Sequence, residues 1–210
     1  MTTGIKRSGL LVVLSSPSGG GKTSVCKKIL SANPEFRYSV SVTTRPPREN
    51  EIDGKDYYFK TKEEFEELVA KDAFAEWAFV HGYYYGSLRA PILSALADGA
   101  ILIFDIDVQG GTKLKKSYEE AVLIFILPPS YDELVRRLKQ RGTESKEQFE
   151  LRLKNALWEY TFWPKYDYLV INDDLDEATD RVHSIIKAEQ SRVSRIRELK
   201  WNLPEKKEDK

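Results

Sequence analysis

An eight-residue, glycine-rich segment constrains the fold of this chain more than any other feature. It reads Ser16-Pro17-Ser18-Gly19-Gly20-Gly21-Lys22-Thr23, directly follows the apolar run Leu10 to Leu14, and opens a helical pattern. Glycines let backbone N–H groups turn toward an anion without Cβ clashes, and a helix N-terminus adds the positive end of its dipole. A strand, such a loop and a helix in this order predict an α/β fold that binds a nucleoside triphosphate.

Further short apolar runs extend this pattern. They cover Ile101 to Ile106, Val122 to Leu127 and Tyr168 to Ile171. Runs that are apolar on both faces are typical of strands buried between helices. Helical patterns alternate with them over Lys22 to Leu30, Tyr131 to Arg141 and Leu175 to Leu199, the last expected as one long helix. Alternating strands and helices predict a parallel sheet flanked by helices.

Two segments interrupt the alternation. Phe36 to Tyr85 contains aromatic-rich alternating pieces around one clear helical pattern, Lys62 to Lys71, so we expect a small mixed lobe inserted into the core. Pro128 to Pro164 is helical and basic. Five apolar residues of this second segment recur at helical spacing and are expected on one face: Phe149, Leu153, Ala156, Leu157 and Tyr160.

Composition narrows the class of protein. The 33 basic and 33 acidic residues cancel, which argues against a dedicated nucleic-acid binder. The single cysteine, Cys26, excludes an intramolecular disulfide, and two histidines with one cysteine cannot form a usual zinc cluster. Met1 to Ser8 has no apolar signal core, and no apolar run approaches the ~18 residues that span a bilayer. We expect a soluble cytoplasmic protein without a membrane partner.

The glycine-rich segment also assigns chemistry to its last residues. Lys22 can reach the β- and γ-phosphates, and the Thr23 hydroxyl can bind Mg²⁺ directly. Ser16 stands where the usual pattern begins with glycine. The alternative is a glycine-rich turn that only links strand to helix.

Two carboxylates lie near the end of the second apolar run. Asp105 and Asp107 are two residues apart, so on a strand they point to the same face. Ligands of open parallel sheets bind beyond the carboxyl ends of the strands. We therefore expect both carboxylates beside the glycine-rich loop, the alternative being a solvated strand end with ordinary ion pairs.

Several motifs, in order over roughly residues 10 to 190, resemble those of guanylate kinases. After the loop they are Ser41-Val42-Thr43-Thr44-Arg45-Pro46-Pro47-Arg48, Gly54-Lys55-Asp56-Tyr57, Phe74-Ala75-Glu76-Trp77, Tyr85-Gly86-Ser87, Asp105-Ile106-Asp107-Val108-Gln109-Gly110 and Asn172-Asp173-Asp174. Two turn positions depart from the family, which often has asparagine at Tyr83 and glycine at Asn50.

The resemblance implies a GMP site. The GMP phosphate would be held by Arg45, Arg48, Tyr57 and Tyr85, since guanidinium forks match phosphate geometry. Glu76 and Asp107 would accept hydrogen bonds from guanine N1–H and its exocyclic amine, and Ser41 and Ser87 would donate toward O6. Adenine presents the opposite groups and would leave these side chains unpaired.

The resemblance also implies an ATP site and a lid. ATP would be bound by Ser16, Pro17, Ser18, Gly19, Gly20, Gly21, Lys22, Thr23, Ser24 and Asn172, the last near adenine. Catalytic charge would come from Lys22, Arg137, Arg141 and Arg152, with Mg²⁺ held by Thr23 directly and by Asp105 through a water. Lid closure would bring arginines to the transferring group and exclude water. Without the other motifs, a solvated basic helix face would explain these arginines.

The implied organisation has a discontinuous core. It comprises residues 1–35, 91–127 and 166–203, with a GMP-binding lobe at 36–90, a lid at 128–165 and a disordered tail at 204–210. The fold is an α/β parallel sheet containing the phosphate loop and flanked by helices. The implied reaction is direct in-line transfer of the ATP γ-phosphoryl group to GMP or dGMP by a monomer or homodimer.

Other function classes stay open from the sequence. Guanylate-kinase-like scaffold modules keep this fold but bind phosphorylated peptides, and they typically have a degraded phosphate loop. Here Lys22 and Thr23 are intact. A kinase for AMP or UMP would not need Glu76 and Asp107, and a generic ATPase or GTPase would not need the arginine and tyrosine pairs.

Overall fold

The computed structural model describes residues 4–80, 82–140 and 146–200. Its centre is a five-stranded sheet in the order β10-β9-β2-β8-β3, and every neighbouring pair is parallel. The strands are β2 Leu10–Ser15, β3 Arg37–Tyr38, β8 Ile101–Asp105, β9 Val122–Leu127 and β10 Tyr168–Ile171. The predicted α/β class is thus confirmed, and β2 lies at the middle of the sheet, which places the glycine-rich loop at its centre.

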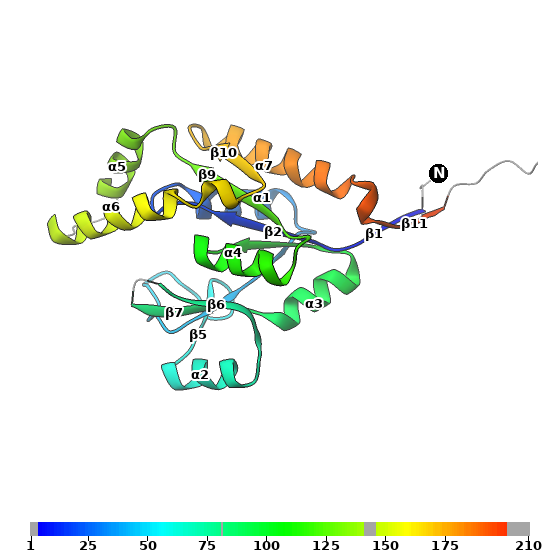
Figure 1. The fold of residues 1–210 in the computed structure, drawn as a ribbon, viewed down its shortest axis with the longest axis horizontal. Coiled ribbons are helices and arrows are strands. Elements are labelled where there is room, and N and C mark those ends of the chain that lie inside the picture. The colour runs from blue at the N-terminus through cyan, green and yellow to red at the C-terminus, as the bar shows by residue number, and fades with distance from the viewer. Residues whose placement is uncertain (1–3, 81, 141–145, 201–210) are drawn as a thin grey trace, which may run out of the picture.

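Helices cover both faces of this sheet (Figure 1). They are α1 Lys22–Ala32 and α7 Leu175–Gln190 on one side, and α3 Arg89–Asp98 and α4 Val108–Ser117 on the other. Alternate residues of β2 enter different cores: Val12 packs in the cluster that holds α1 and α7 residues, and Val13 in the cluster that holds α3 and α4 residues. Burial on both faces explains why the strand is a continuous apolar run.

A second, mixed sheet has the strand order β5-β4-β7-β6. Its strands are β4 Ser41–Thr43, β5 Tyr57–Phe59, β6 Phe74–Val80 and β7 Tyr83–Leu88. Helix α2, Lys62–Ala70, begins with a capping box between Thr61 and Glu64. It packs on the sheet through Phe65, whose ring stacks 4.5 Å from that of Phe74, so this part of the chain has its own small core.

Two helices project beyond the parallel sheet, α5 Tyr131–Gln140 and α6 Lys146–Tyr160 (Figure 1). They pack on each other through a small cluster of Leu134, Leu138, Phe149, Leu153 and Ala156. The expected apolar face of α6 is correct for its three members in that cluster. It is wrong for Leu157 and Tyr160, which are 44% and 46% exposed. The chain then makes a short 3-10 turn, Trp163–Lys165, before β10.

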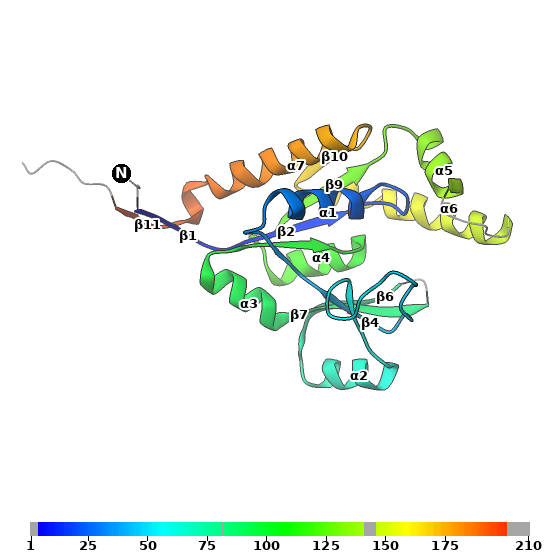
Figure 2. The same cartoon turned by 180° about the vertical axis from the view of Figure 1, so that it is seen from behind.

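The prediction of one helix from Leu175 to Leu199 is wrong. Helix α7 ends at Gln190, a 3-10 turn follows at Val193–Arg195, and Ile196–Lys200 forms strand β11. Strand β11 pairs antiparallel with β1, Gly4–Arg7, so segments near both ends of the chain lie side by side (Figures 1 and 2). Backbone pairing with β1 holds this segment as a strand, and the Arg195 side chain before it is buried against Glu189, with 3.4 Å between Nη2 and Oε2.

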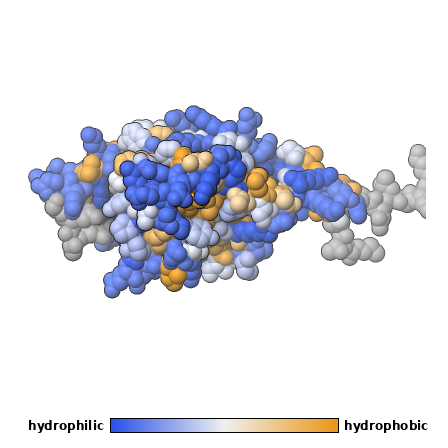
Figure 3. Space-filling view, turned by 90° about the horizontal axis from the view of Figure 1, so that it is seen from below, coloured by the Kyte–Doolittle hydropathy of each residue, from blue (hydrophilic) through white to orange (hydrophobic). Residues whose placement is uncertain are grey.

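On the face shown in Figure 3, hydrophilic residues predominate and hydrophobic ones are scattered among them. Within the described ranges, every helix is too short or too polar to cross a membrane.

Candidate active site

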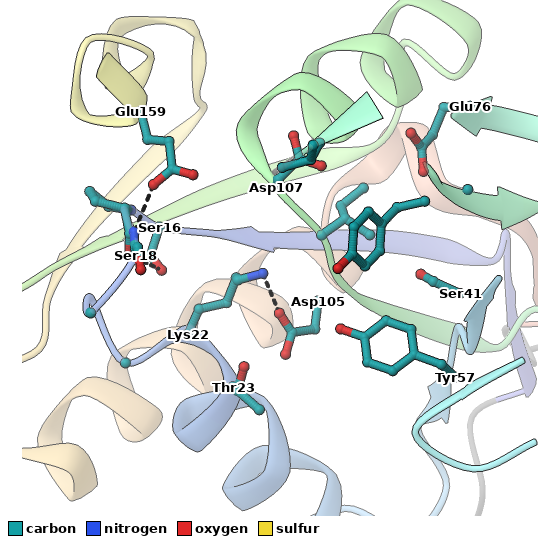
Figure 4. Close-up of a pocket in the computed structure, with 17 residues that line it drawn as sticks. Ser16, Ser18, Lys22, Thr23, Ser41, Tyr57, Glu76, Asp105, Asp107 and Glu159 are labelled. Carbon is teal, nitrogen blue, oxygen red and sulfur yellow. Dashed lines mark hydrogen bonds and ion pairs between the residues drawn. The ribbon is translucent and has the colours of Figure 1, made fainter. Parts of the chain in front are cut away.

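A cleft of about 220 Å³ lies between the carboxyl edge of the parallel sheet and the mixed sheet (Figure 4). Four parts of the chain line it. The glycine-rich loop contributes Ser16 to Gly19 and Gly21 to Thr23, and the end of β8 contributes Asp105 to Asp107. The mixed sheet contributes Ser41, Tyr57, Glu76, Val80, Tyr85 and Gly86, and α6 contributes Glu159.

The glycine-rich loop wraps the N-terminus of α1. Gly19 and Gly21 have φ angles of 88° and 90°, in the left-handed region that favours glycine. The N–H of Gly20 donates to the carbonyl of Pro17 at 2.9 Å. A Cβ on Gly20 would lie 2.7 Å from that of Ser16, so the bare Gly20 makes room for serine at the first position of the loop.

Lys22 points across the cleft to the last residue of β8. Its Nζ lies 2.5 Å from Oδ1 of Asp105, and both side chains are largely buried (Figure 4). Burial alone lowers the pKa of Lys22, but the Asp105 carboxylate outweighs it and holds the pKa above its ordinary value. The lysine is therefore a fixed cation at the edge of the sheet.

Asp105 and Asp107 both line the cleft, as expected, but they belong to different elements. Asp107 is the N-cap of α4, and its Oδ1 accepts from the N–H groups of Gln109 at 2.7 Å and Gly110 at 3.2 Å. Helix capping thus fixes the Asp107 carboxylate.

The mixed sheet brings a buried carboxylate to the other end of the cleft. Ser87 Oγ donates to Glu76 Oε1 at 2.7 Å, and Glu76 is only 7% exposed. Burial, aided by the nearby Asp107, raises the pKa of Glu76 from 4.5 to about 7. Ser41 lies opposite Ser87 in the register of β4 and β7. The structure therefore gathers all four residues predicted to recognise guanine.

Of the four residues predicted to hold the GMP phosphate, only the two tyrosines line the cleft. Tyr57 and Tyr85 face each other with ring centroids 6.1 Å apart. Arg45 lies next to them, 5.4 Å from the Tyr57 ring, with its guanidinium 2.8 Å from Glu51. Arg48 is exposed, and its backbone N–H donates to Glu51 at 2.8 Å.

The predicted lid arginines do not line the cleft where they are described. Arg137 Nη2 donates to the backbone carbonyl of Asn172 at 2.9 Å, and Arg152 is half-buried on α6. Arg141 lies outside the described residues, as does the predicted tail at 204–210. The side chain of Asn172 is buried and donates to the carbonyl of Gly20 at 3.0 Å, so it stabilises the glycine-rich loop.

Sequence reasoning missed Glu159. Its Oε2 accepts from the Ser18 N–H at 2.7 Å, at the end of the cleft opposite Glu76 (Figure 4). Glu159 and Ala156 are the two buried residues of α6 and lie three apart, hence on one face. The sequence alone carries no local signal for Glu159, because its partner Ser18 lies in a distant part of the chain.

Magnesium has a suitable donor set here. The Thr23 hydroxyl and the Asp105 carboxylate both line the cleft, and Mg²⁺ uses one or two protein oxygens beside waters and phosphates. In the parts of the chain that are described, no group of three or more His, Cys, Asp or Glu side chains could hold a metal by itself. The cleft therefore fits a metal that arrives with a nucleotide.

Comparisons with known proteins agree on one family. The sequence model of the family "Guanylate kinase" matches residues 8–189. The chain is 46% identical over 201 residues to a guanylate kinase of Caldanaerobacter subterraneus, covering 96% of this chain and 98% of the relative. It is 50% identical over 193 residues to one of Syntrophotalea carbinolica, covering 92% of each. The crystal structure of guanylate kinase from Anaplasma phagocytophilum matches with a TM-score of 0.78 and 38% identity, covering 91% and 92% of the two chains.

Proposed function

This chain belongs to the guanylate kinase family and is an ATP:GMP phosphotransferase, and we propose that the transfer takes place in the cleft described above. One observation carries the assignment. The same cleft is lined at its centre by a phosphate loop with an intact lysine and at one end by a carboxylate cluster suited to guanine.

The centre of the cleft suits the phosphates of ATP. The backbone N–H of Ser24 donates to the carbonyl of Gly21, and this bond begins α1. The first N–H groups of the helix, those of Lys22 and Thr23, have no partner within the helix and can therefore bind an anion. Lys22 adds a buried positive charge. When ATP binds, the Lys22 ammonium group contacts the β- and γ-phosphates, either in place of Asp105 or in addition to it.

The acceptor end suits guanine. Glu76 Oε1 and Oε2 present acceptors for N1–H and the exocyclic amine, with the capped carboxylate of Asp107 beside them. Adenine has no N1–H and would leave the buried Glu76, whose Oε1 accepts from Ser87, without a donor from the base, which costs several orders of magnitude in specificity. We propose that Tyr57 and Tyr85 contact the phosphate of a bound GMP, and that the Arg45 guanidinium leaves Glu51 to join them. The exposed side chain of Arg48 would complete the phosphate site.

Chemistry then requires no general base. The attacking atom is an anionic phosphate oxygen of GMP, so catalysis consists of positioning and charge stabilisation. Magnesium, when bound with ATP, neutralises phosphate charge, and Thr23 and Asp105 would hold it. Lys22 orients the phosphates, and we propose that Arg137, Arg141 and Arg152 approach them on lid closure, which also excludes water.

The main alternative is a phosphopeptide-binding module. Such a module would have no need for the buried Lys22–Asp105 pair or the guanine-type cluster around Glu76. ATP and GMP are cytoplasmic metabolites, so we propose the cytoplasm as the place of action. Assembly as a monomer or homodimer stays a prediction.

A substrate panel tests the function. The protein is incubated with ATP, Mg²⁺ and GMP, dGMP, AMP or UMP, and ADP formation is measured. We expect turnover with GMP, weaker turnover with dGMP, and at least about a hundredfold less with AMP and UMP. No GMP-dependent turnover together with tight binding of phosphopeptides would refute the assignment.

A further inference from the structure

The glycine-rich loop has a side-chain contact that the proposed reaction does not use. Glu159, near the end of α6, places Oε2 2.7 Å from the backbone nitrogen of Ser18. We propose that Glu159 is a positioning residue that holds the first half of the phosphate loop in its binding shape. This inference rests on the proposed use of the loop to bind ATP.

Burial makes the contact strong. Glu159 is only 6% exposed, and a hydrogen bond from an N–H to a buried carboxylate is charge-assisted and about twice as strong as a neutral one. The two residues are 141 positions apart in the sequence, so only the tertiary fold brings the carboxylate to the loop. A surface glutamate of α6 would need no such arrangement.

The loop is held at neighbouring points from three directions. Glu159 holds the Ser18 N–H, Asn172 Nδ2 donates to the Gly20 carbonyl, and Leu134 and Leu138 of α5 pack against Gly19. A Cβ on Gly19 would lie 3.3 Å from both leucines. The loop backbone is thereby held by contacts from α6, from Asn172 after β10 and from α5, which favours one loop conformation.

The contact with Glu159 lies at a part of the loop where the carboxylate does not compete with phosphate for N–H donors. The N–H groups best placed for an anion are those at the start of α1, from Gly21 onward, where the helix dipole ends. Ser18 precedes them by three residues. Glu159 therefore occupies a donor outside that group and leaves the helix N-terminus open to phosphate.

The contact also joins α6 to the loop. Glu159 lies one residue before the end of α6, close to where the chain returns to the parallel sheet through the turn Trp163–Lys165. The C-terminal end of α6 and the phosphate loop are thus expected to move as one body. Arg137 and Arg152 lie on the other parts of α5 and α6.

Binding of ATP with Mg²⁺, measured by calorimetry without GMP, tests the role. Glu159→Ala should weaken ATP binding about tenfold, because the loop loses its charged acceptor. Glu159→Gln keeps an acceptor oxygen of the same reach and should stay within about threefold of the unchanged protein. The matched control is Glu150→Ala, which removes an exposed glutamate of the same helix whose partner is Lys146 and should change nothing.

A second readout reports on the loop directly. Amide exchange at Ser18, followed by NMR, should become faster in Glu159→Ala and stay slow in Glu159→Gln. In steady-state assays the KM for ATP should rise in Glu159→Ala, whereas the KM for GMP should not. If Glu159→Ala does not fold, Glu159→Asp, which is one methylene too short, should weaken ATP binding in the same direction.

Several results would overturn the proposal. Equal or tighter ATP binding by Glu159→Ala would mean that the carboxylate competes with phosphate. Amide exchange at Ser18 that is as slow in Glu159→Ala as in the unchanged protein would mean that the carboxylate does not hold the loop. Calorimetry and amide exchange need no GMP turnover, so their failure is distinguishable from failure of the proposed function, which would appear as absent GMP-dependent turnover in the unchanged protein.

Discussion

The buried Glu76 carboxylate should destabilise the free enzyme as the pH rises. Burial raises its pKa from 4.5 to about 7, so the folded state holds this proton more tightly than the unfolded state does. The cost of ionisation is therefore absent below pH 4.5, grows between pH 4.5 and pH 7, and is complete above pH 7. A shift of this size corresponds to about 3 kcal/mol of unfolding free energy.

Glu76→Gln removes that cost while keeping an acceptor for the Ser87 hydroxyl. We expect the unchanged protein to lose about 2 kcal/mol more unfolding free energy than the variant between pH 5 and pH 8. All other titrating groups are common to both proteins and cancel in the comparison. The assay is urea unfolding at several pH values, with fits of the midpoint and slope for each protein.

Parallel pH profiles for the two proteins would refute the reasoning. A second consequence can be checked on the same samples. Guanine donors stabilise the ionised form of Glu76, so GMP binding should release a proton near neutral pH and weaken as the pH falls below 7. Glu76→Gln should bind GMP poorly at every pH and without this dependence.

Three further predictions concern the cleft. Lys22→Ala should lower kcat by about a hundredfold or more in the GMP assay and lower the urea midpoint, because the buried Asp105 loses its cation; an active variant would contradict the loop assignment. Arg48→Ala should raise the KM for GMP about tenfold with an unchanged urea midpoint, since the residue is exposed; unchanged GMP kinetics would show that Arg48 does not contact the phosphate. Gly110→Ala places a methyl group 2.9 Å from Glu76 Oε2 and should raise the KM for GMP several-fold without loss of stability. A KM for GMP that stays normal in Gly110→Ala would contradict the argument.

The sequence predicted the centre of the fold well because that part is encoded locally. The runs Leu10 to Leu14 and Val122 to Leu127 are apolar on both faces, and the structure has β2 and β9 there. The glycine-rich segment predicted the strand, loop and helix around Lys22 for the same reason. Such patterns need no knowledge of distant partners.

Other features depend on distant partners and could not be read locally. The polar stretch after Gln190 is compatible with a helix, and only pairing with Gly4–Arg7 makes it a strand. Glu159 resembles any solvated glutamate of a helix until Ser18 is placed beside it. Asn172 was expected near adenine, yet its side chain contacts Gly20 from a strand end more than 150 residues away.

The pairing of β1 with β11 also bears on how the protein is made. Its register joins Gly4 to Lys200, so β1 leaves the ribosome long before its partner strand β11 has been synthesised. The parallel sheet and its covering helix α7 are complete at Gln190 and can assemble earlier. Because β1 and β11 lie side by side, a short linker from Lys200 to Gly4 with new ends in an exposed loop should give a circular permutant that folds.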